Sequence, residues 1–214
     1  MIKQSSTSRL AIALGIAILF FFLMFSIWTA PMINFWLTMC ITGLTLSLYT
    51  IFIGWRKYGK QEIKFNLSSI LIGIGSAALL WGIFWLGNKV STSIFSFAGE
   101  GISNIHSIKS GNSPILIGFM LVCLIGPAEE IFWRGYVQNN LSKKFGKNLG
   151  FVVATALYTL VHIWSFNPML ILAAMVAGGF WGLMYRFLPK NLAPLIISHA
   201  LWDVSVFILF PIGG

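Results

Sequence analysis

Charged residues are scarce in this chain of 214 residues. Only 9% of the residues are Asp, Glu, Lys or Arg, five of them are acidic, and 57% of the chain is hydrophobic. A soluble domain usually carries about 25% charged residues, so the composition excludes an ordinary soluble protein and indicates a membrane protein. Cysteine is scarce too. Cys40 and Cys123 both lie in apolar runs, where we expect small buried side chains and neither a disulfide nor a redox site.

Long apolar runs make up most of what is present. A membrane-spanning helix needs about 20 apolar residues, and most of the runs reach that length. They are Leu10–Ala30, Met32–Ile53, Leu67–Leu86, Pro114–Ala128, Phe151–Trp164, Met169–Leu188 and Leu192–Phe210. Phe151–Trp164 is short, and Pro114–Ala128 reaches spanning length only by continuing through a Glu-Glu-Arg cluster. The runs predict an all-α, polytopic transmembrane bundle of about seven helices, located in the cell membrane as a multi-pass protein.

The basic residues alternate between the two sides of the membrane that such a bundle defines. Leaving aside Arg134, they divide 11 against 2. The larger group comprises Lys3, Arg9, Arg56, Lys57, Lys60, Lys64, Lys143, Lys144, Lys147, Arg186 and Lys190, and the smaller one comprises Lys89 and Lys109. Because basic residues accumulate on the cytoplasmic side, the N-terminus is predicted to be cytoplasmic. The net charge of +9 is therefore read as a topology signal, and we expect the lipid bilayer rather than nucleic acid as a partner.

The chain divides at a polar stretch into two parts of a single predicted membrane domain. Residues 1–113 hold three predicted helices, and residues 114–214 hold the remaining ones. The stretch 88–113 is rich in Gly, Ser and Asn, too polar to span a membrane and too long for a tight turn. It could be an outer loop, an interfacial helix or a lid. Nothing in the sequence indicates the oligomeric state.

Five ionisable residues fall within the predicted spans: Glu129, Glu130, His162, His199 and Asp203. Such groups are costly at membrane depth, so they normally face a protein or water-filled interior and pair with one another. At 1.5 Å per residue, the first glutamate and the two histidines lie roughly 13–22 Å from the cytoplasmic ends of their helices. We therefore expect these groups to share one cavity.

Helical spacing predicts which of these groups pair. Glu130 and Arg134 are four residues apart, so they lie on one helix face and can form an ion pair. Glu129 lies about 100° away around the helix and is freer to point into a cavity.

The histidines have neighbours at the same helical spacing. His199 and Asp203 are also four residues apart, so the carboxylate can orient the imidazole or share a substrate contact. Tyr158 precedes His162 by four residues and can support its ring on the same helix face.

A buried carboxylate beside imidazoles is suited to the activation of water. Glu129 could act as the base, while His162 and His199 could stabilise an oxyanion or protonate a leaving amine. The same three residues could instead hold zinc with an open position for water. No His-Glu-x-x-His motif is present, so spacing does not support the metal, and metal-free water activation is an equal alternative. The groups could also be polar contacts between helices, or belong to a small transporter.

These residues resemble the motifs of the CPBP family, the CAAX protease and bacteriocin-processing intramembrane proteases. The family's Glu-Glu-x-x-x-Arg motif is matched by Glu129, Glu130 and Arg134. Its Phe-x-x-x-His motif is matched at His162, with Tyr158 in the aromatic position. Its final His-x-x-x-Asn/Asp motif is matched by His199 and Asp203. The resemblance covers about Pro114–Phe210.

The resemblance implies a role for each matched residue. Glu129 would activate the hydrolytic water with His162, and Glu130 would assist while held by Arg134. His199 and Asp203 would bind the oxyanion. An ionised Asp203 could not donate a hydrogen bond, however, and could instead orient the imidazole.

The resemblance thus predicts an intramembrane endopeptidase, acting on membrane-associated peptides of the prenylated or leader type. The substrate would be a peptide or lipidated protein, possible roles being bacteriocin immunity or peptide maturation. The alternative is a non-catalytic membrane immunity or interaction protein that keeps the protease fold. Replacement of Glu129 would abolish activity in the first case and leave it nearly intact in the second.

Overall fold

The computed structural model describes residues 2–58, 60–189 and 191–213, with residues 2–7, 57 and 58 placed by their backbone alone. Lys190 and the side chains of Lys3 and Lys57, which entered the predicted topology, lie outside the described residues. Within the described part, helices are the only repeating structure, apart from one isolated bridge between Glu62 and Asn191.

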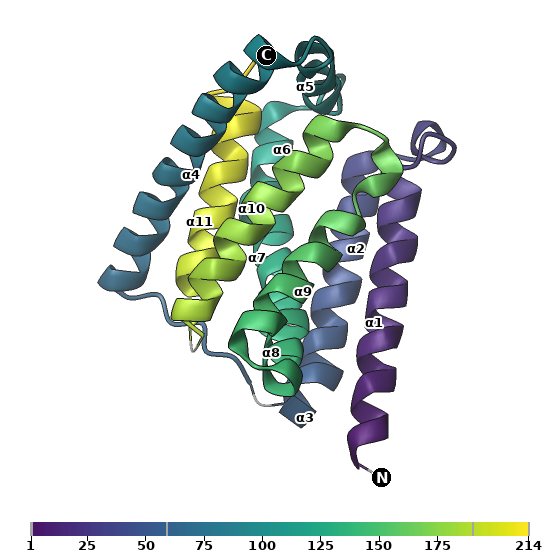
Figure 1. Ribbon diagram of the computed structural model, residues 1–214, viewed down its shortest axis with the longest axis vertical. Helices are drawn as coiled ribbons and strands as arrows, with labels where there is room; N and C mark the ends of the chain where they lie inside the picture. Colours follow the sequence, from purple (N-terminus) through teal and green to yellow (C-terminus); the bar gives the residue numbers. More distant parts are fainter. Residues whose placement is uncertain (1, 59, 190, 214) are drawn as a thin grey trace.

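The helices form an up-and-down bundle (Figure 1). The main elements are α1 (Ile2–Phe25), α2 (Phe35–Tyr49), α3 (Trp55–Tyr58), α4 (Leu67–Ile94), α5 (Ala98–Ser107), α6 (Pro114–Met120), α7 (Gly126–Glu129), α8 (Asn139–Phe145), α9 (Lys147–Leu160), α10 (Pro168–Phe187) and α11 (Ala193–Val204). Among the described residues, six helical segments are long and apolar enough to cross a membrane, and Ala193–Leu209 is a shorter apolar helix. The predicted polytopic bundle of about seven helices is confirmed.

Local sequence signals set where several of these helices begin. Asn34, Asn66 and Asn167 cap α2, α4 and α10, each accepting hydrogen bonds from backbone N–H groups that have no partner inside the helix. Pro114 and Pro168 occupy the first turns of α6 and α10, where a missing N–H is harmless.

The fourth span runs continuously through the Glu-Glu-Arg cluster, from Pro114 to Phe145. Its α-helical pieces α6, α7 and α8 are joined by the π-helical turns Leu121–Ile125 and Glu130–Gln138. Pro127 lies between these turns and cannot donate the N–H of a regular helix, which loosens the hydrogen-bonding pattern around it. Insertions of this type widen the helix and redirect side chains, and they are frequent at functional sites.

The polar stretch 88–113 is mostly helical. Helix α4 continues to Ile94, and α5 then covers one end of the bundle (Figure 1). Two hydrogen bonds hold this region to neighbouring helices. Asn167 Nδ2 donates to Gly101 O at 2.8 Å, and Trp36 Nε1 donates to Ile108 O at 3.2 Å. The stretch is therefore largely helical, and the three interpretations of it, an outer loop, an interfacial helix and a lid, stay open.

The cysteines are free, but their burial differs from expectation. Cys40 is half-buried, and Cys123 is exposed on the bundle surface. An exposed apolar residue is ordinary on a spanning helix because lipid replaces water as its surroundings. The prediction that Cys123 is buried was wrong for this reason.

Two glycines allow α8 and α9 to form a tight antiparallel pair. Gly146 joins them with φ +84°, a conformation that residues with a side chain rarely adopt. A Cβ at Gly150 would collide with the backbone N of Ser142 on α8. In contrast, a Cβ at Gly179 on α10 would meet only Thr155 Cγ2, at 3.8 Å.

Gly150→Ala is expected to destabilise the protein by about 1–3 kcal/mol, because a rigid backbone atom blocks the added methyl group. Gly179→Ala is the matched control and should be neutral or slightly stabilising. Thermal unfolding of the detergent-solubilised variants measures both. Equal stability of the two variants would contradict the close approach at Gly150.

Candidate active site

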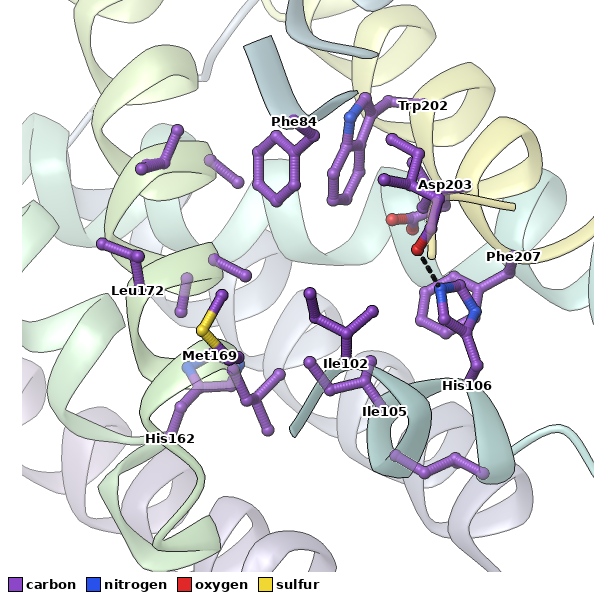
Figure 2. Close-up of a pocket in the computed structure, with 18 of the residues that line it drawn as sticks. Phe84, Ile102, Ile105, His106, His162, Met169, Leu172, Trp202, Asp203 and Phe207 are labelled. Atoms are coloured by element: carbon purple, nitrogen blue, oxygen red, sulfur yellow. Dashed lines mark hydrogen bonds between the residues drawn. The ribbon is translucent and has the colours of Figure 1, made fainter. Parts of the chain in front are cut away.

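A cavity of about 300 Å³ lies within the bundle and is lined mainly by apolar side chains. Aliphatic and aromatic residues such as Phe84, Leu172 and Phe207 surround it in Figure 2. Five polar or ionisable residues that the sequence singled out also line it: Glu129, Tyr158, His162, His199 and Asp203. The helices thus bring together groups from three separate stretches of the chain. Glu130 and Arg134 are absent from the lining and lie behind it.

Of the two adjacent glutamates, Glu129 is the one that faces the cavity. It is the last residue of α7, and its side chain is buried among the surrounding helices. The hydroxyl of Tyr158 donates a hydrogen bond of 2.9 Å to its Oε2. The sequence predicted that Tyr158 supports His162, but a contact with Glu129 was not foreseen. That contact depends on the hydroxyl group, which the phenylalanine of the related motif lacks.

Glu130 points in a different direction and is fully buried. Its Oε1 accepts hydrogen bonds from Arg134 Nη1 at 2.8 Å and from His199 Nδ1 at 2.7 Å. Arg134 Nη2 also donates to the carbonyl oxygen of Gly178 at 3.1 Å. The ion pair expected from helical spacing is therefore present, and it extends to α10 and α11.

His199 lies between two carboxyl groups. Because a carboxylate oxygen accepts hydrogen bonds, the contact with Glu130 assigns the donor role to Nδ1. The other nitrogen, Nε2, lies 3.6 Å from Asp203 Oδ2, an ion-pair distance beyond that of a good hydrogen bond. Trp181 stacks on the imidazole at 3.8 Å between ring centroids, with its rings inclined by 16°. The ring orientation is consequently restrained on three sides.

His162 follows the last turn of α9. Its Nδ1 lies 2.8 Å from Tyr158 O, and since a carbonyl only accepts, Nδ1 carries the hydrogen. Phe21, Phe25 and Tyr158 surround the ring at centroid distances of 5.1, 5.0 and 5.2 Å. Nε2 is therefore the nitrogen left for a water molecule or substrate in the cavity.

A metal at this site would need donor atoms from Glu129, His162 and His199. No group of three His, Cys, Asp or Glu side chains in the described chain is arranged as a metal site. In Glu129, His162 and His199, three potential donor atoms already have protein partners: Oε2, Nδ1 and Nδ1 respectively. One donor atom remains on each residue, Oε1 of Glu129 and Nε2 of the two histidines, and metal-binding histidines commonly hold their second nitrogen in such a contact, so these hydrogen bonds do not decide between the metal and metal-free alternatives.

Two functional contacts were missed by the sequence reasoning. Trp181 fixes His199 by stacking, while its Nε1 donates to Ser198 Oγ at 3.1 Å. Gly178 does more than permit close packing, since its carbonyl binds Arg134 and an added Cβ would lie 2.6 Å from the ring of Tyr158. In the sequence, Trp181 is visible only as one tryptophan within the glycine-rich stretch of α10. No spacing rule predicts that it contacts His199, because the two residues lie on different helices.

Fold and site together define a polytopic membrane protein with carboxylates and imidazoles gathered in an apolar cavity at membrane depth. Residues 111–205 match the family model described as type II CAAX prenyl endopeptidase Rce1-like. This region contains every predicted site residue, so the resemblance to the CAAX-protease family is confirmed, and it supports an intramembrane endopeptidase. Comparisons with curated proteins and with solved structures gave no match.

Because Glu130 and Arg134 form a buried ion pair, we expect the stability of the protein to depend strongly on Arg134. In Arg134→Met, Glu130 would lose its permanent cation, and breaking a buried pair in this way costs about 3–5 kcal/mol. The double variant Glu130→Gln/Arg134→Met removes both charges and should lose less stability than the sum of the two single changes. Denaturant titration in detergent measures this coupling.

Arg186→Met is the control for loss of an arginine, because Arg186 contacts Asn148 at the exposed end of α10. It should change the free energy of unfolding by less than about 1 kcal/mol. If the Arg134 and Arg186 variants were equally stable, the buried pair would have no special structural role.

Proposed function

We propose that this protein is an intramembrane endopeptidase in which Glu129 activates the water that attacks a peptide bond. The proposal rests on the different surroundings of the two adjacent glutamates. Glu129 lines the cavity, whereas Glu130 is fully buried behind it and bound by Arg134 and His199. One carboxylate is thus available for chemistry, while its neighbour is committed to protein contacts.

The hydroxyl of Tyr158 orients Glu129 for this role. It engages Oε2, so Oε1 remains to take a proton from water. As the proton moves to Glu129, the water oxygen forms a bond to the carbonyl carbon of the substrate. The carbonyl oxygen then carries the negative charge of a tetrahedral intermediate.

The two histidines serve different parts of this intermediate. In its imidazolium form, His199 can donate from Nε2 to the oxyanion, and Glu130 and Asp203 on either side favour that charge. Asp203 then orients the ring rather than donating to the oxyanion itself.

Collapse of the intermediate breaks the carbon–nitrogen bond and requires a proton on the leaving amine. His162 assists Glu129 in relaying the proton taken from water to that nitrogen, because its Nε2 is free of protein partners in the described structure. The proton is returned to the product amine, and the carboxylate is regenerated.

The apolar lining favours an apolar, membrane-associated peptide as substrate. Prenylated peptides and leader-type peptides both have this character. Within such a function, the protein would act in the cell membrane in peptide maturation or bacteriocin immunity.

Glu129→Gln tests the proposal directly because it removes the base while nearly preserving the shape of the side chain. General-base catalysis contributes about 10²- to 10⁴-fold, so peptide products should fall by at least that factor. Membranes expressing either form are compared by mass spectrometry of peptides and new protein termini. Glu62→Gln is the matched control, since Glu62 is an exposed partner of Lys64 and should retain full activity.

Equal product levels from wild type and Glu129→Gln, with both proteins folded and abundant, would refute the enzyme in favour of a non-catalytic binding or immunity protein.

Tyr158→Phe tests whether the hydroxyl positions the base. Loss of a hydrogen bond to a charged group costs about 1.5–3 kcal/mol, and we expect kcat to fall about 10- to 150-fold with KM little changed. Tyr185→Phe is the control, because its hydroxyl contacts Gln61 at 3.2 Å, away from the cavity. An unchanged kcat in Tyr158→Phe would remove the hydroxyl from the mechanism.

A further inference from the structure

The cavity occupies one half of the bundle. Most of its lining residues lie toward the same end of their spanning helices, although on α10 the lining extends from Met169 to Trp181. They include Phe25 at the end of α1, Trp36 near the start of α2, Asn88 late in α4 and Met169 at the start of α10. Ile102 and His106 of α5, which covers that end, also contribute (Figures 1 and 2). We call this end the α5 end.

The opposite half is a packed core. Following Glu129 along the fourth span, every residue from Phe132 to Leu141 is buried. Gln138 Nε2 ties this segment to α10 by a hydrogen bond of 2.8 Å to Gly182 O. Tyr136 is 1% exposed and Val137 is 0% exposed. A substrate coming from that direction would have to displace a fully packed layer before reaching Glu129.

The packed half ends at the basic side of the protein. The described basic residues there are Arg9, Arg56, Lys60, Lys64, Lys143, Lys144, Lys147 and Arg186. Direct contacts confirm that distant segments share this end, since Tyr49 OH donates to Arg9 O at 2.9 Å and Arg186 Nη2 to Asn148 Oδ1 at 2.6 Å.

At the α5 end, the described loops and helix ends carry only Lys89 and Lys109 as permanent cations. By the positive-inside rule, the basic end is cytoplasmic and the α5 end is extracytoplasmic.

Buried acceptors mark the α5 end of the cavity. Burial lowers the pKa of His106 below its ordinary value, which favours the neutral ring. Its Nε2 lies 3.0 Å from Ile212 O and donates to it (Figure 2), so Nδ1 is an acceptor, without a partner in the described structure. Asn88 Oδ1 is a second buried acceptor without a described partner. His106 Nδ1 and Asn88 Oδ1 could both accept hydrogen bonds from the backbone N–H groups of a bound peptide.

We infer that the substrate is an apolar peptide segment that reaches Glu129 from the extracytoplasmic half of the bilayer. This inference rests on the proposed endopeptidase function and specifies its substrate. Membrane-inserted segments of exported or surface-exposed proteins have the required chemistry and position. A prenylated tail in the cytoplasm would have to approach through the packed basic half. The geometry therefore disfavours this class of substrate.

The orientation of the cavity can be measured without a substrate. In a Cys40→Ala/Cys123→Ala background, single cysteines are placed at Asn88, which lines the cavity, and at Phe65, which is 62% exposed beyond the basic end. Neither change alters the charge of the loops. A membrane-impermeant, negatively charged methanethiosulfonate is added to spheroplasts or to inverted membrane vesicles of a bacterial expression host.

Asn88→Cys should react at least tenfold faster in spheroplasts, and Phe65→Cys at least tenfold faster in inverted vesicles. The reverse pattern would place the cavity on the cytoplasmic side and overturn the inference.

The substrate class is tested in the same cells by mapping the new termini that depend on Glu129. Cleavage sites should fall in the extracytoplasmic half of membrane-inserted segments. Sites confined to cytoplasmic tails would overturn the inference while leaving the endopeptidase intact. If wild type and Glu129→Gln gave identical termini, the proposed function and its substrate would both fail, and the thiol labelling would still report the orientation.

Discussion

One oxygen of a buried carboxylate holds the site together. Glu130 Oε1 accepts hydrogen bonds from both Arg134 and His199, and Arg134 continues the chain of contacts to the carbonyl of Gly178. The fourth span, α10 and α11 are thereby joined at a buried point, where an unpaired polar group is costly. Glu130 is held by Arg134 of its own span and by His199 of α11, and α10 contributes through the contact of Gly178 with Arg134. Because Glu130 accepts the hydrogen bonds of Arg134 and His199, the side chain of Glu129 can face the cavity.

The distribution of packing explains where the cavity and the proposed catalytic groups lie. Large aromatic and aliphatic side chains fill the half of the bundle between the two glutamates and the basic end. In the fourth span, every residue from Phe132 to Leu141 is buried. The other half contains a cavity that α5 covers and that reaches the middle of the fourth span at Glu129 and Trp181 on α10. The groups proposed to be catalytic are thereby shielded from bulk water yet remain within reach of an apolar ligand.

Much of this architecture could be predicted, because lipid imposes simple rules on sequence. Apolar runs located the spans, and the spacing of Glu130 and Arg134 predicted their ion pair. The contact between Glu130 and His199 could not be predicted in the same way, because 69 residues separate them and no periodicity relates one helix to another. Likewise, the spacing of Tyr158 and His162 suggested only mutual support. The hydroxyl contact with Glu129 depends on how α9 packs against the fourth span.

The sequence by itself determined the class of structure, the set of ionisable groups at membrane depth and the asymmetry of basic charge. Each follows from local composition or from spacing along one helix, where 3.6 residues per turn decide which side chains share a face. Only the tertiary structure decided that Glu129 faces the cavity while Glu130 is buried behind it, and that the cavity opens in the half away from the basic residues. The rotation and depth of each helix are set by side-chain packing between helices, through contacts such as Gly178 with Tyr158 and Gly150 with Ser142.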